Sequence, residues 1–442
     1  MSLKRQLLLV SLLVLILPWA GCQFIRETES ALREGQQQML AGTARAVAES
    51  LAQYGDEFPS ANNSDFMIGD QIYGHPLATA PEIDGYFDDW LLGEASLREL
   101  PGADGVIRYV VGVHDAHVYL YVRVVDRSPV YADAQSLVPN PGAPQADRVR
   151  LISADPPYLE EFLSFAAEAP GTIVPVRKTD FGFAPEPAVR AYWQDVPRGY
   201  QLEARIPARL LGAHLGLEVQ NATSREAAGV RSRSFASRSP GRFVTASPAL
   251  AQVAAGLAQP GMRLIVTDAA GWRIATAGDV SAGAAPQPTV VSTWLRLAYN
   301  AFVDAGTGAG FAEPDPGGRE QRNYIAAALN GRLESAWFRS PETGRAVVAV
   351  AAPVTAEGVI VGAVVVQRGT EAILSLRNET LARLLNVTLI TMLAVVVALL
   401  GYATLLSRRI RHLSVAAEKA LEGDDLHTAL PSALAGDEIG DL

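Results

Sequence analysis

The chain has 442 residues, 49% hydrophobic and 19% charged, a composition typical of globular domains with some membrane-embedded length and unlike that of a disordered or fibrous protein. Its net charge of -10 argues against a nucleic-acid partner, because phosphate contacts need a surplus of Lys and Arg on one face. Cys22 is the only cysteine and no group of Cys and His has metal-ligand spacing, so we expect no intramolecular disulfide, no metal and no cofactor in this chain.

Two apolar segments lie near the ends of the chain. Residues 1–25 contain an apolar run behind Lys4 and Arg5, and Leu384 to Leu406 form a longer run without a charge, followed directly by arginines. A run of about twenty apolar residues can cross a bilayer as one helix, and basic flanks mark the cytoplasmic side. The sequence therefore predicts two transmembrane helices, at 1–25 and 384–406, in a multi-pass protein of the bacterial inner (cytoplasmic) membrane with a periplasmic sensor domain between them.

The end of the first apolar segment allows a second interpretation. Trp19-Ala20-Gly21-Cys22 is similar to a lipoprotein cleavage site, at which Cys22 would be acylated. Trp19 is also a natural anchor at a membrane interface, which favours an uncleaved helix. A carbohydrate-binding lipoprotein of the cell envelope therefore stays open as an alternative.

Residues 26–56 have the pattern of a long helix. The segment lacks proline, and Ile25, Leu32, Met39 and Ala46 recur at seven-residue spacing beside Leu40 and Val47. This spacing predicts one apolar stripe along a helix. The stripe can lie on the chain's own domain or pair with the same helix of a second subunit; the two are compatible, and we expect a homodimer.

Residues 73–245 read as short alternating strands separated by turn residues, which is typical of an antiparallel β-sandwich. In the run Val118 to Val124, the period of two sends the valines and Leu120 to one face, and the other face carries Tyr119, Tyr121 and Arg123. We expect the first face to be core and the second to meet water or ligand.

The motif Ile-Asp-Gly-Tyr-Phe-Asp-Asp-Trp at 83–90, the strand at 119–122 and the strand at 200–206 resemble a family nine carbohydrate-binding module. In such modules the Asp-Gly turn and the Trp of this motif are structural. The resemblance therefore implies turn and core-packing roles for Asp84, Gly85 and Trp90.

Sugar binding needs aromatic faces for stacking and planar polar groups for the hydroxyls. The candidate ligand-binding residues on these grounds are Tyr119, Tyr121, Arg123, Asp126 and Tyr192. The alternative is that the tyrosines are ordinary half-exposed residues of a sheet. We expect a glycan or another envelope component as the ligand.

Residues 260–370 form a second predicted unit, with strands at Arg263 to Asp268, Ala346 to Val354 and Val359 to Gln367. A long first helix followed by a sheet whose last strand leads into an apolar helix resembles the Cache/PAS-like sensor domains of bacterial receptors. On this interpretation the β-sandwich is an insertion between the helix and its sheet.

Residues 407–442 resemble the start of a HAMP relay module, with a first helix, a connector that begins at a glycine, and an Asp-Glu-x-Gly opening of a second helix. The positions that carry this resemblance are Ile410, Leu413, Ala417, Gly423, Leu426, Asp437, Glu438 and Gly440.

The segments together resemble the sensor histidine kinases of the proteobacterial dedicated sortase system. This resemblance implies an output that uses ATP and Mg to phosphorylate a cognate response regulator, although no catalytic residue or catalytic domain lies in these 442 residues. The predicted fold class is an α+β membrane receptor with two transmembrane helices, an antiparallel β-sandwich, a Cache/PAS-like α/β sensor domain and a truncated HAMP coiled coil. A receptor with a diguanylate cyclase or chemotaxis output is an alternative within the same class.

Overall fold

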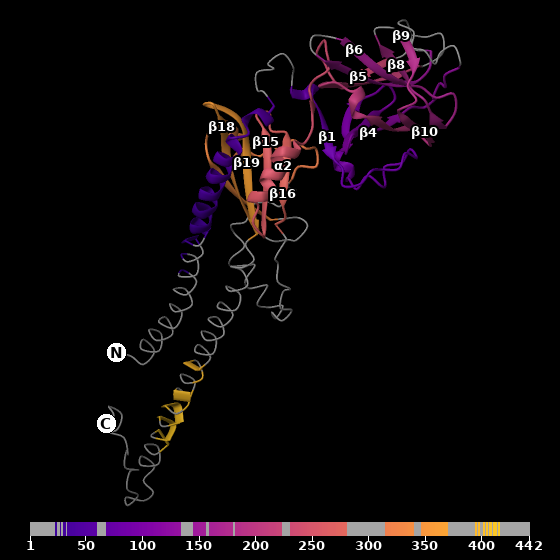
Figure 1. Cartoon of the computed structure of the whole chain (residues 1–442). Helices are drawn as coiled ribbons and strands as arrows, with labels where there is room; N and C mark the ends of the chain where they lie inside the picture. Colours follow the sequence, from indigo (N-terminus) through magenta and orange to yellow (C-terminus); the bar gives the residue numbers. More distant parts are fainter. Residues whose placement is uncertain are drawn as a thin grey trace, which may run out of the picture. The chain divides into compact units, whose positions relative to one another are not determined.

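The computed structural model describes residues 33–59, 68–133, 145–155, 159–179, 182–222, 230–280, 314–339 and 346–369, with isolated residues between 23 and 31 and between 394 and 415. The chain divides into two compact units, one comprising residues 33–371 and the other 1–32 and 372–442. All described strands belong to the first unit (Figure 1).

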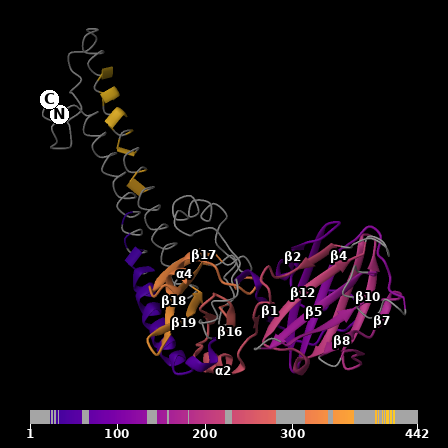
Figure 2. The ribbon, with the colours of Figure 1, turned by 90° about the horizontal axis from the view of Figure 1, so that it is seen from above.

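Strands β1 to β14 form two sheets packed face to face (Figure 2). The eight-stranded sheet has the order β14-β1-β3-β4-β11-β10-β7, with β2 beside β3. Its strands are β1 (Ile72–Pro76), β2 (Arg98–Pro101), β3 (Val106–His114), β4 (His117–Val125), β7 (Gly171–Ile173), β10 (Arg190–Val196), β11 (Gly199–Pro207) and β14 (Phe243–Val244). The six-stranded sheet, in the order β13-β12-β5-β6-β8-β9, has the strands β5 (Arg148–Asp155), β6 (Leu159–Phe165), β8 (Val176–Thr179), β9 (Gly182–Pro185), β12 (His214–Asn221) and β13 (Val230–Arg233).

The core of the sandwich is built from alternate residues of the strands. Leu202, Ala204 and Ile206 of β11 face Leu215 and Leu217 of β12, and all five are 0% exposed. Because successive side chains of a strand point to opposite faces, each strand gives every second residue to this core. The strand predicted at 200–206 is thereby confirmed.

Strand β4 is buried on both faces. Val118 and Leu120 point into the sandwich core, whereas Tyr119 and Tyr121 point outward but are only 2% and 0% exposed. The segment 77–97 packs over that outer side. The expectation that this face meets water or ligand was therefore wrong, because alternation shows which residues share a face and not what lies on it.

A second domain follows the sandwich along the chain. Its five-stranded antiparallel sheet has the order β16-β15-β19-β18-β17. The strands are β15 (Met262–Asp268), β16 (Arg273–Gly278), β17 (Glu334–Arg339), β18 (Ala346–Ala356) and β19 (Val359–Gly369). The strands predicted at 263–268, 346–354 and 359–367 are confirmed. The assignment of this domain to the Cache/PAS-like type stays a prediction.

Helices cover both faces of this sheet. A helix over residues 33–52 and α2 (Pro248–Leu257) share a hydrophobic cluster with Leu264 and Val266 of β15, whereas α4 (Asn323–Leu329) packs against Ile265 on the other face. The remaining described helices are short 3-10 turns, η1 (Gly55–Glu57), η2 (Ile68–Asp70), η3 (Glu94–Ser96) and η4 (Ala208–Leu210).

The long helix buries Leu40 and Val47 of the predicted stripe but not Met39. Leu40, Ala44, Val47 and Leu51 are buried against the sheet, whereas Met39 is 55% exposed. The spacing of the buried residues, four, three and four, is the helical period for packing on a sheet. The helix therefore lies on its own domain, and the heptad through Met39 does not mark the buried face.

No helix in the described part of the chain combines the length and apolar character needed to span a membrane. The predicted α+β membrane receptor with two transmembrane helices is corrected by this finding, because the described residues form three β-sheets with few helices. The predicted location, a multi-pass protein of the inner membrane with a periplasmic sensor, is corrected on the same ground. Residues 1–22, which include Cys22, and most of 384–406 lie outside the described residues. So do all the HAMP positions named above except Ile410.

Candidate functional site

The predicted ligand face of the sandwich is filled by the chain's own aromatic side chains. The ring of Phe87 stacks on Tyr121 at a centroid distance of 5.0 Å, and Trp90 meets Tyr121 edge-on at 6.2 Å. Trp90 also meets Tyr119 edge-on at 6.3 Å. The stacking surfaces that a sugar would need are therefore already used inside the domain.

Glu203 of β11 holds the covering segment in place. Its Oε2 accepts hydrogen bonds from the backbone N–H of Asp84 at 3.0 Å and of Gly85 at 2.9 Å. Its Oε1 accepts one from Trp90 Nε1 at 2.8 Å. Glu203 is 0% exposed, and this burial raises the pKa of its carboxyl to about 7 although the three N–H donors act in the opposite direction.

The Asp-Gly turn is fixed by local geometry. Asp84 Oδ1 accepts a hydrogen bond from the N–H of Tyr86 at 3.0 Å. Gly85 has φ +91°, and a Cβ there would lie 2.7 Å from Gln194 Cβ. Asp84, Gly85, Trp90 and Glu203 thus form one hydrogen-bonded group. Glu203 was missed by the sequence analysis, although the alternation along 200–206 puts it beside Tyr121.

The other candidate ligand residues are divided between two places. Arg123 lies on the same sheet face, donates to the hydroxyl of Tyr121 at 3.2 Å and pairs with Glu94 at 3.4 Å. Tyr192 lies two strands away in the same row, opposite Glu203 of β11, and its ring borders Gly85. The structure thus brings Tyr119, Tyr121, Arg123 and Tyr192 onto one face, and it does not bring Asp126 there.

Asp126 forms a buried pair with Asp147 at one end of the sandwich. Asp126 accepts from Asn221 Nδ2 at 2.7 Å and from the N–H of Ser128 at 2.8 Å. Asp147 accepts from the N–H of Ala222 at 2.7 Å and of Val130 at 2.8 Å. Burial raises the pKa of Asp147 to about 7, and Asp126 acts in the same direction. With their oxygens occupied by N–H donors, the two carboxyls tie strand ends together.

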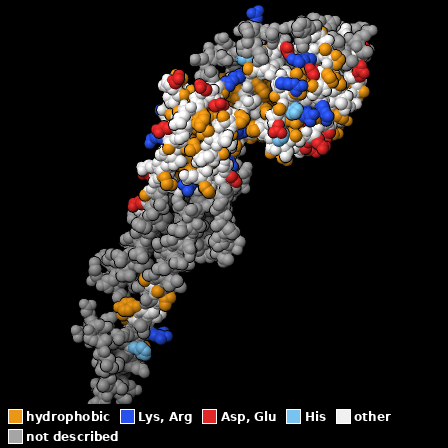
Figure 3. Space-filling model, viewed as in Figure 1, with side chains coloured by type: hydrophobic (Ala, Val, Ile, Leu, Met, Phe, Trp, Pro, Cys, Tyr) orange, Lys and Arg blue, Asp and Glu red, His pale blue; other side chains and the backbone are white. Residues whose placement is uncertain are grey.

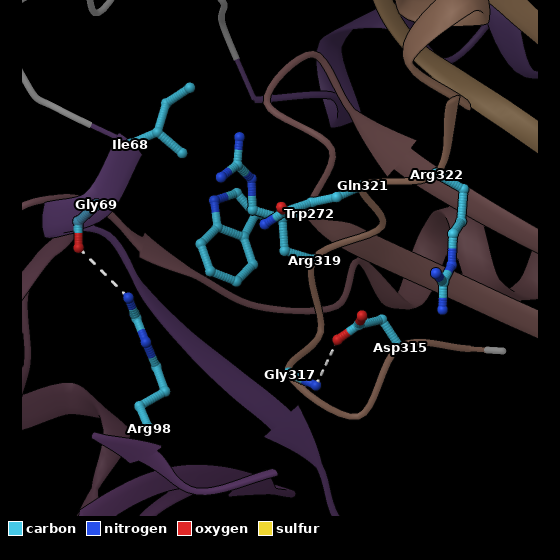
Figure 4. A pocket seen from close by; sticks show the side chains of 9 residues that line it. All are labelled: Ile68, Gly69, Arg98, Trp272, Asp315, Gly317, Arg319, Gln321 and Arg322. Carbon is cyan, nitrogen blue, oxygen red and sulfur yellow. Dashed lines mark hydrogen bonds between the residues drawn. The ribbon is translucent and has the colours of Figure 1, made fainter. Parts of the chain in front are cut away.

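A polar cavity of about 430 Å³ lies where the sandwich meets the second domain (Figure 4). Its walls come from η2, from β2, from the turn between β15 and β16, and from the loop that precedes α4. The lining residues are Ile68, Gly69, Arg98, Trp272, Asp315, Gly317, Arg319, Gln321 and Arg322. We call this space the Trp272 cavity.

The turn between β15 and β16 presents Trp272 to this cavity. Asp268 Oδ1 accepts from the N–H of Ala270 at 2.9 Å and of Trp272 at 2.8 Å, and Gly271 takes the positive φ of +85° that the turn requires. The indole of Trp272 donates through Nε1 to Gln71 Oε1. It also stacks on Tyr73 of β1, with a centroid distance of 5.6 Å and an interplanar angle of 9°.

The loop before α4 is held by a buried ion pair. Glu320, 3% exposed, accepts from Arg273 Nη1 at 3.0 Å and from the N–H of Asp315 at 3.0 Å. Gly318 has φ +81°, and its α-carbon faces the ring of Tyr73 so closely that a Cβ would overlap the ring. The loop is therefore fixed against β1 and against the Trp272 turn, and its arginines are positioned by backbone that is itself held.

Arg98 and Arg319 lie over the indole of Trp272, at 5.8 and 5.9 Å from the ring centroid. Arg98 donates to the carbonyls of Gln71 and Gly69, and Arg319 Nε donates to the carbonyl of Ala270 at 3.0 Å. Within the described ranges neither arginine is at ion-pair distance from a carboxylate.

The surroundings of the cavity are electropositive. The pKa of the nearby His75 is lowered to about 4 by burial and by the charges of Arg273 and Arg98. Three arginines line the cavity against one aspartate, Asp315. Over the visible face of the described domains both acidic and basic side chains are spread over the surface (Figure 3).

None of the residues that line the Trp272 cavity was predicted from the sequence to be part of a site. Its residues come from segments far apart in the chain, and Arg98 and Arg319 each read as ordinary surface charges. The available signal was local: the run Asp-Pro-Gly-Gly-Arg at 315–319 combines turn residues with a basic residue just before a helix. In the part of the chain that the structure describes, no group of three or more His, Cys, Asp or Glu residues could hold a metal ion.

No protein-family model matches the chain, and no curated protein matches it. Among solved structures it is similar to a carbohydrate-binding module of family nine from Caldicellulosiruptor kristjanssonii in complex with cellotriose, with 16% identity, a TM-score of 0.26, and coverage of 37% of this chain and 82% of that chain. The same module in complex with glucose gives 17% identity, a TM-score of 0.25, and coverage of 37% and 84%. At such TM-scores the saccharides in those structures are no guide to the ligand of this chain. Both of these solved structures are family nine carbohydrate-binding modules.

Proposed function

We propose that this chain is the ligand-binding sensor region of a signalling receptor and that the Trp272 cavity is its ligand site. The observation that supports this proposal is the composition of the cavity wall, which combines Arg98 of the sandwich with the turn and the loop of the second domain. A ligand in the cavity contacts both domains at once. If it binds one arrangement of them better than another, it shifts the population between the two.

A contiguous route leads from the cavity to the last described strand. Trp272 lies in the turn that follows β15, and β15 pairs along its length with β19, for example Val266 with Val364. Such a route supports a relay but does not by itself demonstrate coupling. The nature of the output rests on the sequence resemblance: a histidine kinase that acts on a response regulator, through a HAMP-type relay, in a homodimer.

The proposal is tested by fusing the full chain to the catalytic core of a characterised histidine kinase and measuring autophosphorylation. Trp272→Phe keeps a packed aromatic ring and removes the hydrogen bond to Gln71. We expect this change to shift basal phosphorylation by about threefold or more, since losing a hydrogen bond of about 1 kcal/mol alters a two-state balance by that order.

The matched control is Arg177→Gln. Arg177 pairs with Glu161 and Glu186 on the sandwich and does not line the cavity. We expect unchanged phosphorylation in this variant. Equal phosphorylation in Trp272→Phe and the unmodified fusion would contradict the proposal that the cavity controls an output.

A further inference from the structure

The charge of the Trp272 cavity identifies a class of ligand. Arg98 comes from β2 of the sandwich, whereas Arg319 and Arg322 come from the loop before α4 (Figure 4). Guanidinium groups are planar and carry several N–H donors in a fixed geometry that matches carboxylate and phosphate oxygens. Of these, Arg98 and Arg319 form no ion pair with a carboxylate in the described part of the chain.

The hydrogen bonds already made by these arginines leave donors for a ligand. An arginine carries five N–H donors. Arg319 gives Nε to the carbonyl of Ala270, and Arg98 gives one donor each to the carbonyls of Gln71 and Gly69. Backbone carbonyls orient the guanidinium groups without neutralising them. Asp268 interacts with Arg319 through its charge, but neither Arg98 nor Arg319 forms an ion pair with a carboxylate of the described residues.

The volume limits the size of the ligand. A cavity of about 430 Å³ lies in the range of pockets that take small molecules, roughly 300–1,000 Å³. The buried indole of Trp272 supplies an apolar edge next to the two guanidinium groups. A compact molecule with one anionic group and a small apolar part fits this combination better than a neutral polymer.

We infer that the Trp272 cavity binds a small oxyanion ligand, whose carboxylate or phosphate group lies between Arg98 and Arg319. This inference rests on the proposed function, since it names the ligand class of the same site. The anion joins a residue of the sandwich to a residue of the second domain. Its binding energy therefore favours the arrangement in which the two arginines are close.

The test uses the full chain and isothermal titration calorimetry with three probes. Glucuronate and glucose share a ring and differ by a carboxylate, and inorganic phosphate carries the anion without a ring. We expect glucuronate, phosphate or both to bind at least about tenfold more tightly than glucose, as a charge-assisted hydrogen bond provides. Binding of glucuronate alone identifies a carboxylate ligand, and binding of phosphate alone identifies a phosphoryl ligand.

Substitutions of single arginines distinguish binding in the Trp272 cavity from a general attraction of anions to positive charge. Arg98→Gln and Arg319→Gln should each weaken binding of the tighter probe by about tenfold or more, and Arg177→Gln, which removes the same charge elsewhere, should leave it unchanged. Arg98→Lys retains the charge and should weaken binding less than Arg98→Gln, which keeps the test valid if the glutamine variant folds poorly. Failure of both anions to bind, or equal loss in Arg177→Gln, would overturn the inference.

The two proposals fail in different ways. If glucose binds as tightly as glucuronate and Trp272→Phe weakens both, the cavity is a ligand site and only the oxyanion class is wrong. If the anions bind through Arg98 and Arg319 but phosphorylation of the kinase fusion does not respond to them, the inference stands and the sensor function is wrong.

Discussion

Two regions of the molecule bring aromatic and charged side chains together, with opposite results. The Glu203 cluster (Asp84, Gly85, Trp90, Tyr121 and Glu203) has its carboxylate surrounded by three N–H donors and its rings covered. In the Trp272 cavity, Arg98 and Arg319 donate to backbone carbonyls and keep their charge. Aromatic and charged residue types therefore do not by themselves identify a ligand site. A ligand site is identified by charged or polar groups whose partners the protein does not itself supply.

The largest expected effect comes from removing the carboxylate of Glu203, which disrupts the Glu203 cluster. Glu203→Ala leaves the N–H groups of Asp84, Gly85 and Trp90 without their acceptor. Since an unsatisfied buried donor costs about 1–3 kcal/mol, we expect a loss of about 3–5 kcal/mol in the free energy of unfolding. Urea unfolding of the full chain, followed by tryptophan fluorescence, measures it.

A conservative variant controls for the volume of the side chain. Glu203→Gln keeps one oxygen and should lose about half as much. If Glu203→Ala costs less than about 1 kcal/mol, the cluster is not the structural anchor described above, and its tyrosines become candidates for a ligand again.

The next effect concerns the backbone that shapes the cavity. Gly318→Ala places a Cβ against the ring of Tyr73 at a backbone φ of +81°. We expect a loss of about 2–3 kcal/mol in unfolding free energy, from overlap and from left-handed strain together. Anion binding should weaken as well, because Arg319 follows Gly318 directly. Gly256→Ala is the control, since a Cβ at Gly256 meets nothing within 4 Å; an equal loss there would exclude a specific contact.

Much of the fold could be predicted from the sequence, and the site could not. Strand β11 is predicted by the alternation of its apolar and polar residues, β19 by its continuous apolar run, and the Asp-Gly turn by its residue types. The covering of Tyr121 by Phe87 and the meeting of Arg98 with Trp272 depend on contacts between distant segments. No period or motif encodes such contacts, so the aromatic strand was taken for a binding face and the cavity was missed.

A further effect, of similar size, is the pH dependence of the free energy of unfolding that the buried Asp126–Asp147 pair causes. Burial raises the pKa of Asp147 from 3.8 to about 7 in the folded chain. Between these values the folded state keeps a proton that the unfolded state has lost, so stability is highest at low pH and falls as the pH rises through about 7. Between about pH 5 and about pH 8 we expect Asp147 to cause a loss on the order of 2–3 kcal/mol in the free energy of unfolding.

Substitution tests whether this pair is the source. Asp147→Asn should flatten the pH dependence without abolishing it, because the raised pKa of Glu203 contributes in the same direction. The exposed Asp88, changed to Asn, should leave the dependence unaltered. If the pH dependence of the unfolding free energy is unchanged in Asp147→Asn, the Asp126–Asp147 pair is not its source.

The smallest expected effect is that of replacing Arg123, which resembles Arg98 in its surroundings but has a carboxylate partner. Arg123, like Arg98, lies beside an aromatic ring, but its charge is paired with Glu94 at 3.4 Å and its Nε is used by Tyr121. The side chains of Arg123 and Glu94 are 30% and 62% exposed, so Arg123→Gln should cost at most about 0.5 kcal/mol in unfolding free energy.

Calorimetry with phosphate completes this comparison of two arginines. Arg123→Gln should leave the phosphate affinity unchanged, whereas Arg98→Gln should weaken it by about tenfold or more. Both changes remove one positive charge from the same sheet, so a general electrostatic effect would lower the affinity equally in both. A difference between them assigns binding to the arginine without a carboxylate partner, because its charge has no counter-ion within the described chain until the ligand supplies one.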